Sequence, residues 1–97
     1  MKPEAFNTII EHLKWELRLH GFISSAASLF YDIIMDHPLV DGNKRSAVLM
    51  LNAYLFRNGY SLRGIEELYE LAIKVAEKKI GKTGVLEWLR ERVVERK

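Results

Sequence analysis

The chain is organised around the run His37-Pro38-Leu39-Val40-Asp41-Gly42-Asn43-Lys44-Arg45, a compact polar stretch between two apolar segments. Downstream, residues 47–56 are apolar except for Asn52. Upstream, apolar residues recur at helical spacing, at Ala27, Leu29, Phe30, Ile33 and Ile34. Both flanks are therefore predicted to be core helices that hold the polar run on a rigid frame.

The local chemistry of the run predicts a helix, a turn and a second helix. Pro38 biases His37 out of the helical region, so the upstream helix is expected to end there with the imidazole at its junction with the loop. Gly42 permits a positive φ and a close approach of the backbone, and Asn43 suits an N-cap. The free N–H groups of the next helix would then point at the loop.

Two cations, Lys44 and Arg45, fall in the first turn of the downstream helix. Turn chemistry alone explains an Asp-Gly-Asn sequence, but it leaves His37 unexplained. The helix dipole disfavours positive charge at an N-terminus unless an anion is present. The run is therefore interpreted as a phosphate-binding site rather than as a simple connection between helices.

The run resembles the signature of the Fic/Doc family, H-x-F-x-[D/E]-G-N-[G/K]-R. The resemblance extends over residues 26–93. With Lys44 in the variable position, the run is similar to the Doc branch, the death-on-curing toxins. The matching positions are His37, Asp41, Gly42, Asn43 and Arg45.

Two departures from the family pattern affect this interpretation. Leu39 stands where the family usually has a phenylalanine that anchors the loop into the core, and a large aliphatic side chain can also do this. Family members also carry an N-terminal β-hairpin flap that holds the backbone of the target. The chain is expected to lack this flap and to engage a protein target weakly, since strand addition takes its affinity from main-chain hydrogen bonds.

The resemblance implies ATP and Mg²⁺ as cofactors and assigns a role to each polar residue. His37 takes the proton from a hydroxyl of a target protein, and Asp41 holds Mg²⁺. These roles fit phosphoryl or nucleotidyl transfer, which needs positioning and charge neutralisation more than covalent help. The phosphates are then bound by Gly42, Asn43, Lys44 and Arg45.

Three functions remain open at this point. The first is a Doc-like toxin that phosphorylates a protein hydroxyl and is held in check by an antitoxin protein. The second is a Fic-like AMP transferase, and the third is a flapless, non-catalytic module that binds nucleotide or a partner. AMP-transferring relatives have glycine at the position of Lys44 and a second arginine at that of Val48, so ATP is expected to present its γ-phosphate here.

The predicted fold is all-α, a single domain covering residues 1–97 with about five helices around a central helix at residues 43–58. Every periodic segment is helical and none alternates with period two. Gly21 is expected to separate a helix at residues 4–19 from one that begins at Ser24 or Ser25 and ends at Asp36. Further helices are expected at residues 65–77 and from Thr83 onward.

Composition excludes some kinds of site and makes others unexpected. The chain has 97 residues, no cysteine and a formal net charge of +2, so neither a disulfide framework nor a thiolate metal site is possible. This mild charge does not make nucleic acid an expected partner. No apolar stretch reaches the roughly 18 residues of a membrane span and no leader pattern is present, so a cytoplasmic protein is expected. Its oligomeric state is not indicated.

Overall fold

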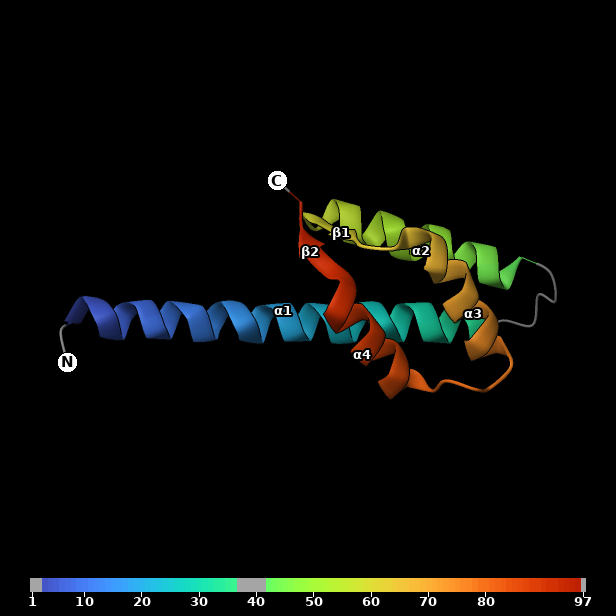
Figure 1. The fold of residues 1–97 in the computed structure, drawn as a ribbon, viewed down its shortest axis with the longest axis horizontal. Coiled ribbons are helices and arrows are strands. Elements are labelled where there is room, and N and C mark those ends of the chain that lie inside the picture. The colour runs from blue at the N-terminus through green and yellow to red at the C-terminus, as the bar shows by residue number, and fades with distance from the viewer. Residues whose placement is uncertain (1–2, 37–41, 97) are drawn as a thin grey trace.

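The computed structural model describes residues 3–36 and 42–96 (Figure 1). Its helices confirm the all-α class. Two three-residue strands and one 3₁₀ turn, η1 (Ile65–Glu67), connect or follow them. Within the described ranges the α-helices are α1 (Pro3–Asp36), α2 (Asn43–Arg57), α3 (Leu68–Ala76) and α4 (Lys82–Arg92), and the strands are β1 (Tyr60–Leu62) and β2 (Val93–Glu95).

The N-terminal segment forms one helix of 34 residues, not the two that were predicted. Gly21 lies inside it and is exposed, and Ser24 and Ser25 continue the helix instead of capping a new one. A glycine in a helix costs only about 1 kcal/mol, which packing of the following turns against the rest of the protein can offset. The described part of the chain therefore has four α-helices where about five were expected.

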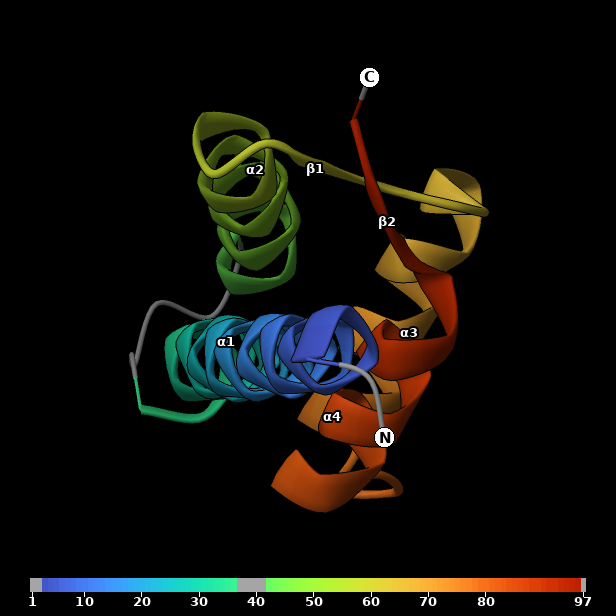
Figure 2. The same cartoon turned by 90° about the vertical axis from the view of Figure 1, so that its left-hand side faces the viewer.

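The core lies along the second half of α1. Figure 2, a view turned by 90°, shows α2 on one side of α1 and α3 with α4 on another. α1 contacts all three of these helices. The residues buried between them are Ile23, Ala26, Ala27, Phe30, Ile34, Ala47, Leu51, Leu55, Leu68, Leu71, Ala72, Val75, Val85 and Leu89.

α2 is not the central helix that its apolar sequence suggested. It buries one face, formed by Ala47, Leu51 and Leu55. Leu49 and Phe56, on its other faces, are 69% and 60% exposed. An apolar run does not say how many sides of a helix will be covered, because that depends on where the other elements pack. The second half of α1 holds the central place instead.

A small antiparallel sheet joins the segment after α2 to the C-terminus. β1 pairs with β2 in the register Tyr60↔Glu95, Ser61↔Val94 and Leu62↔Val93. This corrects the expectation that no segment would form a strand and that the helix from Thr83 would continue onward through the C-terminal residues. Strands of three residues are too short to show an alternating pattern, but the β-branched pair Val93 and Val94 favours extended backbone.

Stacking among three aromatic side chains connects α1 to α2 and to the sheet. The ring of Phe22 stacks on Tyr54 at a centroid distance of 5.0 Å and on Tyr60 at 4.7 Å. The Tyr54 hydroxyl also makes a 2.6 Å hydrogen bond with Oγ of Ser25. Tyr54 therefore packs within the fold.

The molecule is elongated, with principal extents of 58 × 25 × 19 Å. The N-terminal half of α1 projects beyond the other elements (Figure 1). No helix in the described ranges is long and apolar enough to cross a membrane.

The buried face of α2 gives a test of this packing. Replacing Leu51, which is fully buried, with alanine should lower the free energy of unfolding by about 2–5 kcal/mol, because the lost side chain leaves a cavity. Leu49→Ala is the matched control on the same helix and should change stability by less than about 0.5 kcal/mol. Urea denaturation measures both values. Equal losses in the two variants would contradict the observed orientation of α2.

Candidate functional site

The start of α2 lies at the end of the molecule opposite the N-terminus (Figure 1). His37 and Asp41, the predicted base and metal ligand, lie outside the described residues. The other four predicted site residues, Gly42, Asn43, Lys44 and Arg45, form the start of α2.

Gly42 is the N-cap of α2, with φ 105° and ψ −17°. The positive φ predicted for this glycine is confirmed, but the predicted N-cap was Asn43, which is instead the first residue of the helix. The Gly42 carbonyl accepts a 2.7 Å hydrogen bond from the Ser46 N–H and so opens the helical ladder. A glycine at the N-cap has no side chain that could accept a hydrogen bond from the free N–H groups of the first turn, which favours an external anion.

The first turn of α2 carries positive charge only. Lys44 is half-buried, Arg45 is exposed, and no acidic residue lies in this turn. Neither cation forms an ion pair with any residue of the described ranges. Their charges add to the positive end of the helix dipole, so the site attracts anions.

A cavity of about 340 Å³ opens at this helix end. Gly42, Lys44 and Arg45 line it from α2, and Tyr69 lines it from the first turn of α3. A single nucleotide could place phosphate oxygens here because the lining offers cationic and hydroxyl donors. The cavity thus brings together three of the predicted residues.

Tyr69 is the site residue that the sequence analysis missed. It is 41% exposed and lies next to the buried face of α3, which includes Leu68, Leu71 and Ala72. Only the packing of α3 against α2 brings Tyr69 to the start of α2. In the sequence, Tyr69 is only an aromatic residue one position from the apolar face of a helix. Such residues are too common to indicate a binding site.

The described residues provide no metal site of their own. Within residues 3–36 and 42–96, no group of three or more His, Asp or Glu side chains is placed to hold a metal ion. The predicted ligand, Asp41, falls between these ranges.

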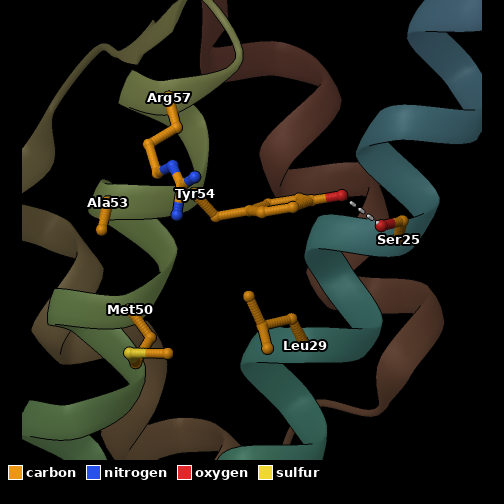
Figure 3. Close-up of a pocket in the computed structure, with 6 residues that line it drawn as sticks. All are labelled: Ser25, Leu29, Met50, Ala53, Tyr54 and Arg57. Atoms are coloured by element: carbon orange, nitrogen blue, oxygen red, sulfur yellow. Dashed lines mark hydrogen bonds between the residues drawn. The ribbon is translucent and has the colours of Figure 1, made fainter.

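Figure 3 shows a second cavity, of about 330 Å³, between α1 and the C-terminal half of α2. Its walls are largely apolar, and the hydrogen bond between Tyr54 and Ser25 closes one side. No residue of the polar run contributes to it. The lining residues are Ser25, Leu29, Met50, Ala53, Tyr54 and Arg57.

Comparison with known proteins gives one result. A model of the family described as Fic/DOC matches residues 2–55, a stretch that includes the whole polar run and nearly all of α2. No curated protein and no solved structure matches the chain.

Substitutions of two glycines test whether Gly42 requires a positive φ. An added Cβ would meet nothing within 4 Å at Gly42 or at Gly21, so the two positions differ in backbone conformation alone. Gly42→Ala should destabilise the protein by about 1–2 kcal/mol, since a side chain disfavours positive φ. Gly21→Ala, inside α1, should stabilise it by about 0.5–1 kcal/mol. Thermal melting gives both signs, and the same sign in both variants would contradict the assigned conformation of Gly42.

Proposed function

Since the chain belongs to the Fic/DOC family, we propose that it is a Doc-like phosphotransferase that moves the γ-phosphoryl group of ATP to a hydroxyl of a target protein. Membership of the family indicates a Fic-type transferase, because these proteins usually transfer nucleotide-derived groups to proteins. The choice of the phosphoryl group depends on the residues around the cavity.

The observation that carries this choice is the position of Lys44. Its half-buried side chain lines the cavity at the start of α2, where AMP-transferring relatives have a glycine. Val48 packs against the core one turn after Arg45, so the second arginine of those relatives has no counterpart there. A cation at the glycine position and none at the next turn favour ATP bound with its γ-phosphate at the helix end.

In the proposed reaction the target hydroxyl oxygen attacks the γ-phosphorus of ATP. The bond from oxygen to the γ-phosphorus forms, the bond from that phosphorus to the β–γ bridging oxygen breaks, and ADP leaves. His37 accepts the hydroxyl proton. Lys44 and Arg45 neutralise the phosphate charge, and the Tyr69 hydroxyl is a further donor beside them.

Mg²⁺ fits this scheme through the chemistry of Asp41. Mg²⁺ is commonly bound by one or two carboxylates together with substrate phosphates, and Asp41 directly precedes the glycine that lines the cavity. The ion would supply charge neutralisation between adjacent phosphates. A toxin of this kind also requires an antitoxin protein, which we propose as a partner of this chain.

The choice between transferred groups can be tested by incubating the protein with a cell lysate and ATP labelled at either the α or the γ phosphate. We expect protein-bound label from γ-labelled ATP only. Label from α-labelled ATP would assign the chain to the AMP-transferring branch. Label from neither, with ATP binding retained, would favour a non-catalytic module. Lys74→Ala is the matched control for Lys44→Ala. Lys74 is exposed on α3 and should be dispensable for transfer.

His37→Ala tests the assigned base. The substitution should lower the rate of transfer by about 10²–10⁴-fold, the usual contribution of a general base. The melting temperature should stay within the error of the wild-type value, because the proposal gives this residue a chemical role. Parallel loss of activity and of thermal stability would instead make His37 a structural residue.

A further inference from the structure

The second cavity, between α1 and the C-terminal half of α2, is separate from the proposed transfer site (Figure 3). Arg57 lines it from the last turn of α2, whereas Lys44 lies in the first turn, about 20 Å away along the helix axis. Among the described residues, none lines both this cavity and the one at the start of α2. A ligand bound here would therefore be distinct from the nucleotide of the proposed reaction.

The aromatic ring of Tyr54 forms one wall of this cavity. Phe22 stacks on one face of the ring, and Ser25 of α1 binds its hydroxyl. Phe22 lies almost one turn before Ser25 on α1, and Leu29 lies about one turn after it. Figure 3 shows the ring edge-on, with Leu29 and Met50 on the same side of it. The face of the ring opposite Phe22 is thus turned toward the cavity.

Arg57 supplies a positive charge at the edge of this largely apolar cavity. Its guanidinium forms no ion pair with any residue of the described ranges. It also lines a neighbouring cavity of about 320 Å³, together with Tyr54 and Asn58. No acidic side chain of the described part of the chain lines either cavity. An apolar space beside a cation matches a ligand that has an apolar body and a negative charge.

The dimensions of the cavity favour a small molecule over a protein partner. From Met50 to Arg57 the cavity follows two turns of α2, about 10 Å. The hydrogen bond between Tyr54 and Ser25 closes one side of it. A stable protein interface buries roughly 1,200–2,000 Å² and needs a longer groove. The volume of about 330 Å³ lies at the lower end of the range for small-molecule sites, roughly 300–1,000 Å³.

We propose that this cavity binds a small aromatic carboxylate. The ring of the ligand stacks on the face of Tyr54 that is turned toward the cavity and contacts Met50, whose sulfur interacts favourably with aromatic rings. The carboxylate accepts two parallel hydrogen bonds from the guanidinium of Arg57. A carboxylate carries a single charge, which Arg57 alone balances, whereas the phosphates of a nucleotide suit the two cations at the start of α2.

2-Naphthoate is a suitable probe, because it joins a flat apolar ring system to one carboxylate. We expect it to bind the full chain with a dissociation constant below about 1 mM. 2-Naphthamide has the same shape without the charge and should bind at least about fivefold more weakly. Equal binding of the two probes would overturn the assigned carboxylate.

The backbone amide chemical shifts of the protein, followed by NMR during each titration, give both dissociation constants and locate the site. Shifts caused by naphthoate should centre on residues 25–29 and 50–57. Shifts confined to residues 42–46 would place naphthoate at the start of α2 and overturn the proposal. The absence of any shift at about 5 mM naphthoate would overturn it as well. Neither result depends on whether the protein transfers a phosphoryl group.

Arg57→Gln tests the contact with the carboxylate. It should weaken naphthoate binding at least about fivefold and change naphthamide binding little, so that the two probes bind alike. Arg90→Gln removes the same charge from an exposed position on α4 and is the matched control, which should keep the wild-type constants. Equal weakening in both variants would mean that naphthoate responds only to net charge, and this would overturn the proposal.

Ala53→Leu tests the cavity itself. Ala53 is exposed and lines the cavity, so a larger side chain should fill part of the space without disturbing the core. Naphthoate binding should fall at least about tenfold, while the melting temperature stays near the wild-type value. Ala76→Leu, at an exposed position of α3, is the matched control. A folded Ala53→Leu variant that binds naphthoate with wild-type affinity would overturn the assignment.

Discussion

The structure depends on close packing between α2 and the second half of α1. Ala26 and Ala27 of α1 and Ala47 of α2 are almost completely buried, and side chains this small allow two helix axes to approach closely. Phe30 of α1 and Leu51 of α2 are fully buried in the same core. This contact fixes the position and direction of α2, and with them the position of Gly42, Lys44 and Arg45 at its start. The position of the proposed anion site is thus set by apolar packing.

Sequence reasoning was most accurate where a residue acts through its own backbone or within one helix. Gly42 has the positive φ expected of it, at 105°. A helix at residues 65–77 was also predicted, because apolar residues such as Leu68, Leu71 and Val75 keep helical spacing there. In each case the signal is local, so neighbouring residues suffice to read it.

Features that depend on contacts between distant segments were not predictable. Gly21 would end an isolated helix, but buried residues from Ile23 onward stabilise α1 through it. The β1–β2 pair joins segments more than thirty residues apart, and Tyr69 reaches the cavity at the start of α2 only through the packing of α3 on α2. The outward position of Leu49 and Phe56 is of the same kind, since it follows from how few elements surround α2.

Cations lie at both ends of α2, but the helix dipole favours only the one at the C-terminal end. At the C-terminal end, Nη2 of Arg96 donates a 3.1 Å hydrogen bond to the Phe56 carbonyl, and its guanidinium lies 4.0 Å from the centre of the Phe56 ring. A cation there is favoured by the helix dipole and stabilises the fold. The same charge at the N-terminal end is disfavoured by the dipole, and Lys44 and Arg45 have no ion-pair partner among the described residues to compensate. Binding an anion would turn this unfavourable placement into a favourable one, which is the physical reason to regard the start of α2 as a phosphate site.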